Sequence, residues 1–243
     1  MPTALITGGA SLLGEGAARA LVKDGWKVVL ADINLEGAQK VAKEVGGAQM
    51  ASAAKLDVVD LDQVRKVVNK VVADHGSIEG LVNCAGGFRG LGIPWRNFME
   101  TTPAEWDALL RPNLIGVLNV CHTVLPKMAA AKKGAIVSIA ASRGLRGGKK
   151  ASIYSAAKAG IIVFSQSLAQ EVAPLGIRVN TIAPGNAEAR WKTAAMESQG
   201  KVVPLGRETS AADVGNAVAF LMSEQASHIT GSCIDVSGGT SLH

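Results

Sequence analysis

The sequence is poor in aromatic residues and has no long basic run. Only 4% of its 243 residues are aromatic, and a single tyrosine is present. Proteins that bind single-stranded nucleic acid commonly stack bases on aromatic side chains beside a basic groove. The net charge is +5, but acids and bases alternate along the helical stretches, which is typical of solvated helix faces. We therefore expect no nucleic acid partner.

Cysteine and histidine are equally sparse. Cys84, Cys121 and Cys233 are far apart and lack C-x-x-C spacing, which predicts buried thiols in a reducing compartment. The four histidines are scattered, so no metal site is predicted. We find neither a signal-like start nor an apolar run long enough to span a bilayer. The expectation is a cytoplasmic protein without a membrane partner.

Apolar residues make up 48% of the chain and glycines number 28, enough for a large core with many tight turns. Short β-branched runs predict strands at Thr3–Thr7, Lys27–Asp32, Met50–Asp57, Glu79–Asn83, Ala135–Ala140, Arg178–Ala183 and Cys233–Val236. Amphipathic stretches predict helices at Gly14–Asp24, Leu35–Val45, Leu61–His75, Pro103–Ala130, Ile153–Ala173 and Ala211–Ser223. This alternation predicts one α/β domain over residues 1–243, with a parallel sheet covered on both faces. The irregular segments Ala85–Thr102 and Pro184–Thr209 follow strands and are expected to line a ligand crevice.

A glycine-rich turn, "TGGASLLGEG", joins the first strand to the first helix. Backbone amides at a helix N-terminus attract anions, and glycine lets a phosphate approach closely. The three-glycine fingerprint G-x-G-x-x-G is not met, so the turn taken alone is equally compatible with a plain strand–helix connection. Asp32 ends the second strand, where a carboxylate can accept hydrogen bonds from an adenosine ribose and repel a 2′-phosphate. It favours NAD over NADP; the alternative role, capping the next helix, suits Asn34 better.

The stretch "YSAAK" places Tyr154 and Lys158 four residues apart, on one helix face. A neighbouring ammonium favours the phenolate and lowers a phenol pKa from about 10 toward the range of a general acid or base. The alternative is a chance pair on a solvated face. The position of the pair after the fifth strand, beside the expected crevice, favours the catalytic interpretation.

These features resemble the short-chain dehydrogenase/reductase family over essentially the whole chain. The motifs that carry the resemblance are Thr7-Gly8 with Gly14, Asp32, "LDV" at 56–58, "NCAG" at 83–86, Asn113 in "RPNLIG", "YSAAK", "RVNTIAPG" at 178–185 and "ITGSCIDVSGG" at 229–239. The resemblance implies a Rossmann-like doubly wound sheet of seven parallel strands and a homotetramer. It also implies an NAD-dependent oxidoreductase that transfers hydride between nicotinamide and a secondary alcohol or ketone.

By the same resemblance, Tyr154 exchanges a proton with the substrate oxygen, Lys158 assists it and binds the nicotinamide ribose, and Asn113 holds a relay water. Pro112 removes an amide within the predicted helix, so we expect a local distortion there. The implied cofactor-binding residues are Gly8, Ser11, Leu12, Leu13, Gly14, Asp32, Ile33, Asp57, Val58, Asn83, Ala85, Gly86, Tyr154, Lys158, Pro184, Gly185 and Ala187.

Three positions depart from the family pattern. Leu12 stands at the middle glycine of the turn, where we expect it to shift or weaken cofactor binding; a longer turn through Gly16 is the less favoured alternative. Ala141 stands where the family has its catalytic serine, thirteen residues before the tyrosine. Ser142 can replace that serine only if the strand has already ended, because neighbouring strand residues face opposite ways. Ala189 stands at the usual threonine, and Asn186 and Glu188 are the two candidates to compensate for it.

Basic residues occur in the expected site loops: Arg89, Arg96, Arg143, Arg146, Arg190 and Lys192. If they converge they suit an anionic substrate, and otherwise they are solvent-exposed loop charges. Phe88, Trp95 and Trp191 are candidates for an apolar wall. The three departures leave two other functions open. One is a catalytically silent binding or scaffold protein, and the other is an isomerase or dehydratase that uses the same proton-transfer pair.

Overall fold

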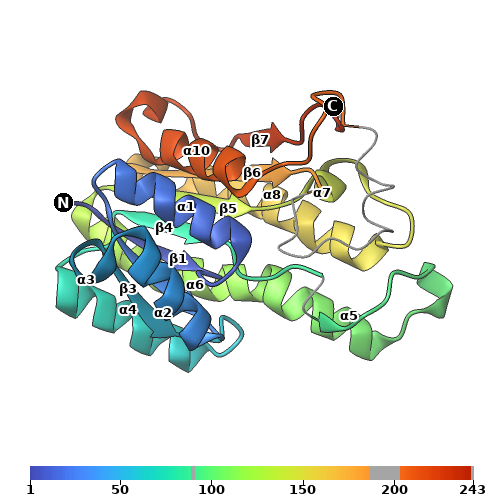
Figure 1. The fold of residues 1–243 in the computed structure, drawn as a ribbon, viewed down its shortest axis with the longest axis horizontal. Coiled ribbons are helices and arrows are strands. Elements are labelled where there is room, and N and C mark those ends of the chain that lie inside the picture. Colours follow the sequence, from blue (N-terminus) through green and yellow to red (C-terminus); the bar gives the residue numbers. More distant parts are fainter. Residues whose placement is uncertain (89–90, 187–202, 242–243) are drawn as a thin grey trace.

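The computed structural model describes residues 1–88, 91–186 and 203–241. Seven strands form one sheet in which every neighbouring pair is parallel, in the order β3-β2-β1-β4-β5-β6-β7 (Figure 1). The strands are β1 Thr3–Thr7, β2 Lys27–Asp32, β3 Ala51–Lys55, β4 Gly80–Asn83, β5 Gly134–Ile139, β6 Ile177–Pro184 and β7 Cys233–Val236. The predicted doubly wound parallel fold is confirmed. The chain order reverses between β1 and β4, where open α/β sheets form their ligand crevice.

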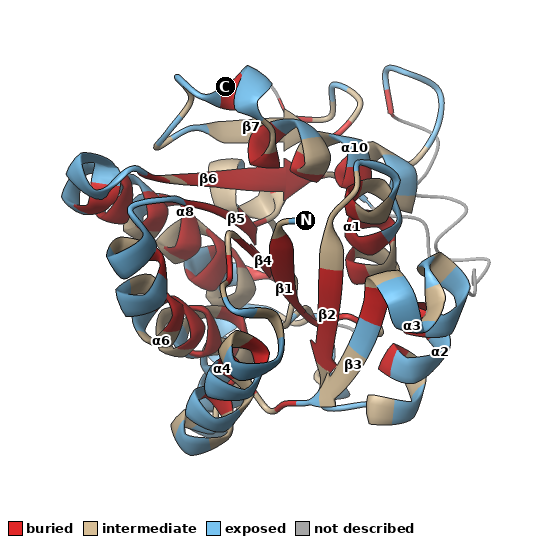
Figure 2. Ribbon diagram, turned by 90° about the vertical axis from the view of Figure 1, so that its left-hand side faces the viewer, coloured by how far each residue is buried: buried red, intermediate tan, exposed pale blue. Residues whose placement is uncertain are grey.

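Helices cover both faces of this sheet (Figure 2). The longer ones are α1 Leu12–Lys23, α2 Leu35–Val45, α4 Leu61–His75, α5 Pro103–Leu110, α6 Gly116–Ala131, α8 Ser152–Val172 and α10 Ala211–Met222. The short ones are α3 Gly47–Met50, α7 Ser142–Arg146, and 3₁₀ turns at Phe98–Glu100, Ala173–Leu175 and Glu224–Ala226. Most predicted elements start and end within one or two residues of these bounds.

Two apolar layers hold the sheet between the helices. Leu5 of β1 belongs to the layer that packs against α4, α6 and α8. Its neighbours Ala4 and Ile6 belong to the opposite layer, with α1, α2 and α10. All five residues of β1 are buried, because a central parallel strand has no solvent-facing side. The near-continuous apolar strand runs in the sequence reflect this double burial.

The helix predicted over Pro103–Ala130 is interrupted. Arg111–Ile115 forms a π turn between α5 and α6, closed by a hydrogen bond from Gly116 N to the carbonyl of Arg111. Pro112 has no N–H group, so the regular ladder cannot continue through it. The distortion expected at Pro112 is confirmed, and it places the buried side chain of Asn113 beneath the cleft described below.

The expectation that no segment is long and apolar enough to span a bilayer is wrong, because one helical segment meets the criteria of length and composition. The helical span Pro103–Ala131 covers 29 residues and is apolar enough to pass that test. Such evidence is weak, because core helices of other proteins pass it too. In this chain Val117, Val120 and Val124 of α6 lie fully or almost fully buried in the core layer of α4 and α8. The core therefore accounts for part of the apolar character of the segment.

Helices α1 and α10 pack against each other through glycine (Figure 1). A Cβ on Gly16 would lie 2.2 Å from the carbonyl oxygen of Ala211, and one on Gly215 would lie 2.3 Å from that of Gly16. Neither distance is possible for a real side chain, so this contact is made by backbone. Gly16 is therefore required for the packing of α1 against α10, and it does not belong to the glycine-rich turn.

We predict that Gly215→Ala lowers the free energy of unfolding by about 1–3 kcal/mol, because the added methyl group must push the two helices apart. Chemical denaturation monitored by circular dichroism would measure this. Gly160→Ala in α8 is the matched control, since its Cβ would lie 3.3 Å from a side-chain carbon of Leu114 that can move. An equal loss in both variants would contradict the packing argument.

Candidate active site

Two adjoining cavities lie at the carboxyl ends of the central strands. The first has a volume of about 300 Å³ and the second about 240 Å³, and both are lined by Cys84, Gly86 and Gly87. The first is also lined by Gly8, Ser11, Asp32, Ile33, Leu56, Asp57, Val58, Ala85, Leu91 and Pro112. The second is also lined by Leu13, Phe88, Trp95, Ile139, Ala140, Ala141, Ser142, Arg143, Tyr154, Lys158, Pro184, Gly185 and Asn186. Together they form one cleft, and both irregular segments predicted to border the site contribute to it.

The glycine-rich turn is short and tightly closed. Ser11 is the N-cap of α1: its Oγ accepts a hydrogen bond from Gly14 N at 3.1 Å and donates one to Gly8 O at 2.6 Å. A Cβ on Gly14 would lie 2.2 Å from Gly8 O, so only glycine fits at this position. Helix α1 begins at Leu12, which excludes the longer turn through Gly16.

The two leucines of the turn differ in their surroundings. Leu13 lines the second cavity and packs against the core, whereas Leu12 is half-buried and lines neither cavity. The Leu12 side chain therefore does not narrow either cavity, and its predicted effect on cofactor binding stays a prediction. Within the described residues, the backbone N–H groups of Leu12 and Leu13 donate no hydrogen bond. They are the free amides of a helix N-terminus, which suit a phosphate.

Asp32 lines the first cavity while organising the turn around it. One carboxylate oxygen accepts from Ala10 N at 2.9 Å and the other from Asn34 N at 2.8 Å. Asn34 caps α2 by accepting from Gly37 N at 3.0 Å, as the sequence predicted. Ile33, at the rim, is 65% exposed. The carboxylate is thus held in place at the end of β2 with lone pairs left for a ligand.

The remaining residues of the first cavity come from the loops after β3 and β4. Asp57 accepts a hydrogen bond from Val59 N at 2.9 Å, which turns the chain away from β3 and ends that strand earlier than predicted. Gly86 and Gly87 have φ values of +116° and +123°, which favour glycine. A Cβ on Gly87 would meet no atom within 4 Å, so the loop presents bare backbone to the cleft.

Asn113 fixes that glycine loop from below. Its Oδ1 accepts from Gly87 N at 2.7 Å, and its Nδ2 donates to Gly87 O and to Leu109 O, each at 2.9 Å. Leu109 is one helical turn earlier, so the side chain replaces part of the backbone ladder disturbed at the π turn. Both N–H groups of the amide are used, and the side chain could act toward a relay water only as an acceptor.

Asn83 lies under the cleft rather than in it. It is buried and lines neither cavity, and its Nδ2 donates to Ser138 Oγ at 3.0 Å. That contact links β4 to β5. Its implied role toward the cofactor would therefore be exerted through the strand positions.

The Tyr154 and Lys158 pair faces the second cavity. Lys158 is only 4% exposed; its Nζ donates to Ile139 O at 2.9 Å and lies 5.8 Å from the Tyr154 ring centre. Burial lowers the pKa of Lys158 to about 8. Burial also raises the pKa of the Cys84 thiol to about 12, so Cys84 is a neutral neighbour at physiological pH. The structure thus brings the predicted ammonium and phenol together.

Ala141 and Ser142 both line the second cavity. Strand β5 ends at Ile139, and Ser142 is the first residue of α7. The condition stated for Ser142, that the strand has already ended, is therefore met. Ser142 is buried and lines the same cavity as Tyr154.

An aromatic wall covers Tyr154. Phe88 and Trp95 stack with ring centres 3.7 Å apart, and each meets the Tyr154 ring edge-on, at 6.0 and 6.1 Å. The Arg143 guanidinium lies 4.9 Å from the Trp95 ring centre. Of the predicted wall, Phe88 and Trp95 are thus in place.

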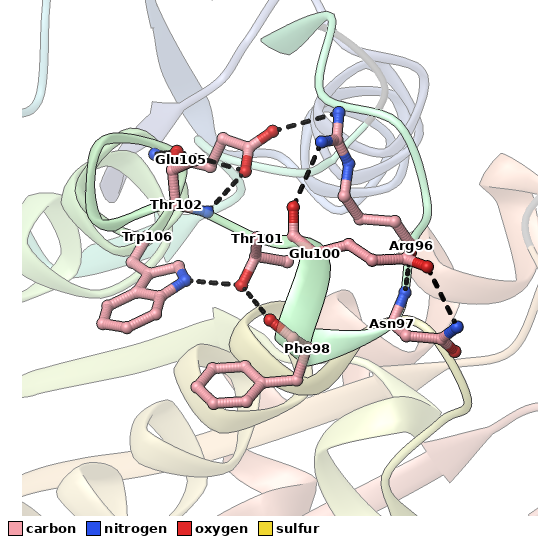
Figure 3. A network of polar contacts seen from close by, with 8 residues as sticks. All are labelled: Arg96, Asn97, Phe98, Glu100, Thr101, Thr102, Glu105 and Trp106. Carbon is pink, nitrogen blue, oxygen red and sulfur yellow. Dashed lines mark hydrogen bonds and ion pairs between the residues drawn. The ribbon is translucent and has the colours of Figure 1, made fainter.

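The segment that follows Trp95 is held by its own polar contacts (Figure 3). Arg96 pairs with Glu105 at 3.3 Å and donates to Glu100 O at 3.3 Å. Trp106 Nε1 donates to Thr101 Oγ1 at 2.7 Å. Arg96 is therefore engaged outside the cleft, and it takes no part in the anion-binding alternative that the sequence left open. Arg146, which donates to Ser241 Oγ at 3.0 Å, does not line the cleft either.

Comparison with known proteins agrees with this geometry. A family model described as Enoyl-(Acyl carrier protein) reductase matches residues 8–241. The 3-oxoacyl-(acyl-carrier-protein) reductase FabG of Thermotoga maritima is 35% identical over 240 residues, which are 97% of this chain and 96% of the relative. The chain belongs to the short-chain dehydrogenase/reductase family.

Two further relatives are similar to this chain over nearly its whole length. The FabG reductase of Escherichia coli K12 is 35% identical over 240 residues, with 97% and 96% of the two chains covered. An uncharacterized oxidoreductase of Mycobacterium bovis is 36% identical over 242 residues, with 98% and 96% covered. The names of these matches share the oxidoreductase class; the family model and the FabG relatives name different reductions, and the mycobacterial relative names no reaction. The chain is thus an oxidoreductase of a family that uses a nicotinamide cofactor.

Some predicted site residues fall outside the described part of the chain: Arg89, Ala187, Glu188, Ala189, Arg190, Trp191 and Lys192. Gly87, Leu56, Leu91 and Pro112 line the cleft and were not predicted to bind a ligand. The double glycine after β4 was the available signal for Gly87. The other three contribute apolar surface or backbone, for which residue type alone gives no signal.

The buried ammonium of Lys158 makes a prediction about stability. Its native pKa is about 8 against 10.5 for a free lysine, so the unfolded chain holds the extra proton between these pH values and stability rises with pH there. Below about pH 8 both states are protonated and the burial penalty is constant. We expect Lys158→Met to be more stable than the parent by about 1–3 kcal/mol at pH 7.

Denaturant unfolding at pH 7, 8, 9 and 10 measures this difference. The advantage of Lys158→Met should shrink across that series. A difference that stays constant with pH would show that the ammonium is not penalised by burial.

Proposed function

We propose that this protein is an NAD-dependent reductase of ketones, or dehydrogenase of secondary alcohols, with Tyr154 as general acid and base. The observation that supports this best is that the Tyr154 phenol and the buried Lys158 ammonium lie in the wall of the second cavity, directly beside the first cavity with its glycine-rich turn. By its family resemblance we also expect a cytoplasmic homotetramer.

The first cavity has the features that an adenine dinucleotide needs. The glycine-rich turn beside it, which contributes Gly8 and Ser11 to the lining, leaves the amides of Leu12 and Leu13 free for a pyrophosphate, and Asp32 offers lone pairs to ribose hydroxyls. Asp57, Val58 and the bare backbone of Gly86 and Gly87 complete the lining. A carboxylate at Asp32 repels a 2′-phosphate, which is the basis for proposing NAD over NADP.

When bound, the nicotinamide supplies or accepts the hydride, and the two electrons move with it. The residues of the chain handle the proton. Tyr154 gives its phenolic proton to the substrate oxygen during reduction and takes one back during oxidation. An ammonium beside a phenol stabilises the phenolate, so Lys158 is expected to lower the free energy of this proton transfer at neutral pH. Asn113 holds the Gly87 loop that borders both cavities.

Ser142 is proposed to donate the hydrogen bond that the family obtains from the serine replaced here by Ala141. Ser142 lies in the first turn of α7, where the chain has left the strand, and it lines the same cavity as Tyr154. A donor of this kind stabilises charge that develops on the reacting oxygen. The proposed activity does not require a donor at residue 141.

The Tyr154→Phe variant should lose turnover of secondary alcohols and ketones, because it removes the proton that is transferred while keeping the ring. Its affinity for NADH should stay within about threefold of the parent, since the ring still fills the same space. Absorbance at the nicotinamide band follows turnover, and fluorescence titration with NADH and NADPH in parallel follows binding and cofactor preference. Retained turnover would overturn the assignment of Tyr154; absence of saturable binding would favour a silent scaffold protein.

The serine proposal is tested by two single variants. Ser142→Ala should lower kcat by roughly 10²–10³, in line with removal of one donor to a reacting oxygen. Ala141→Ser should not raise kcat, because the donor is already supplied by its neighbour. If Ala141→Ser increases kcat strongly and Ser142→Ala does not lower it, Ser142 is not the donor.

A further inference from the structure

The second cavity has an uncompensated positive charge. Two cations, Arg143 and Lys158, line it, and no aspartate or glutamate does so among the described residues. Lys158 Nζ is directed to the carbonyl of Ile139. Arg143 makes no ion pair with the described part of the chain. The cavity therefore offers one guanidinium to whatever enters it.

This guanidinium is held in place by contacts on two sides. It lies 4.9 Å from the ring centre of Trp95, which is itself stacked on Phe88. On the other side, a Cβ on Gly148 would lie 2.1 Å from Arg143 Nη1. Only a glycine at residue 148 leaves room for the guanidinium at this position. A charge that is fixed by stacking and close packing loses little freedom when a ligand binds it.

Arg143 and Tyr154 share a partner, since Trp95 contacts both: its ring centre lies 6.1 Å from that of Tyr154. The guanidinium and the reacting phenol thus belong to the same small cavity, of about 240 Å³. A molecule that spans them is short, with a few bonds between its anionic group and the reacting carbon.

We propose that Arg143 selects substrates that carry a carboxylate, so that the preferred substrates are short oxo acids and the corresponding hydroxy acids. The planar fork of a guanidinium matches a carboxylate with two parallel N–H···O bonds. A single available guanidinium also suits the single charge of a carboxylate better than the double charge of a phosphate monoester. The inference rests on the proposed function for the reaction, and adds the substrate class.

The test uses pairs of substrates that differ in charge and by one methyl group. Pyruvate, acetoacetate and 4-oxopentanoate are compared with their methyl esters, which retain the carbonyl and lose the anion. The parent enzyme should prefer the acid in at least one pair. Arg143→Gln should lower kcat/KM for that acid about 10- to 100-fold, the usual effect of losing a charged hydrogen bond, and change kcat/KM for the ester less than about threefold.

Two further variants separate the charge from its surroundings. Gly148→Ala leaves Arg143 in the chain but occupies the space of its guanidinium, so it should reproduce the selective loss for the acid. Arg146→Gln is the matched control, because Arg146 carries the same charge in the same segment and does not line the cavity. It should leave the ratio of acid to ester unchanged.

Calorimetric titration of acetoacetate into the protein, with and without NADH, provides a readout that does not need turnover. Carboxylate binding that disappears in Arg143→Gln, without turnover of any carbonyl compound, would keep this inference and overturn the proposed reductase activity. Reduction of esters and acids alike, with equal losses in Arg143→Gln, would overturn the inference and keep the activity.

Discussion

The cleft depends on close backbone contacts at the ends of β1 and β4. Gly8 lies so near the chain after β4 that a Cβ would be 2.7 Å from Ala85 N, and a Cβ on Gly14 would be 2.2 Å from Gly8 O. These contacts set the first turn of α1 directly above the glycine loop of Cys84 to Gly87. Both cavities share that loop, so the positions of both follow from the same glycines.

Helix α8 provides the second fixed point, and it reaches the cleft by burying a charge. Lys158 places its ammonium under the end of β5, where Ile139 offers a carbonyl oxygen and the surrounding residues are apolar. Burial of an ammonium is unfavourable in itself, and the lowered pKa of Lys158 records this penalty. A buried ammonium near a phenol therefore lowers the stability of the fold. Groups of this kind with shifted pKa values are common at functional sites.

Much of this arrangement could be predicted from the sequence, because it is local. Apolar runs gave β1, β2 and β7 with their observed bounds, and Asn34 was identified as the cap of α2. The distortion at Pro112 followed from a missing N–H group, and the face shared by Tyr154 and Lys158 followed from helical spacing. The resemblance to a family supplied the roles of residues that pattern alone leaves open.

What could not be predicted arises from contacts between distant segments. Nothing in the spacing of Phe88, Trp95 and Arg143 indicates that they stack on one another, or that Arg96 turns away to Glu105 (Figure 3). Asp32 accepts hydrogen bonds from Ala10 N and Asn34 N and also lines a cavity. Its contact with Ala10 likewise depends on the tertiary fold and has no signal in the local sequence. The apolar character of Pro103–Ala131 was underestimated, although a helix was predicted over Pro103–Ala130, because the charged residues Glu105, Asp107 and Arg111 interrupt the apolar run.

That π turn has a consequence for how the chain tolerates change. Five residues close the turn at Arg111–Ile115 where an ordinary helix needs fewer, so α5 and α6 differ in angular phase by the extra residue. If the same residues wound as a regular α-helix, one helix would rotate against the other by about 100°. The Val117 and Val124 face would then leave the sheet, or Asn113 would leave the glycine loop. A substitution at Pro112 that lets the segment wind regularly should therefore displace one of these two contacts.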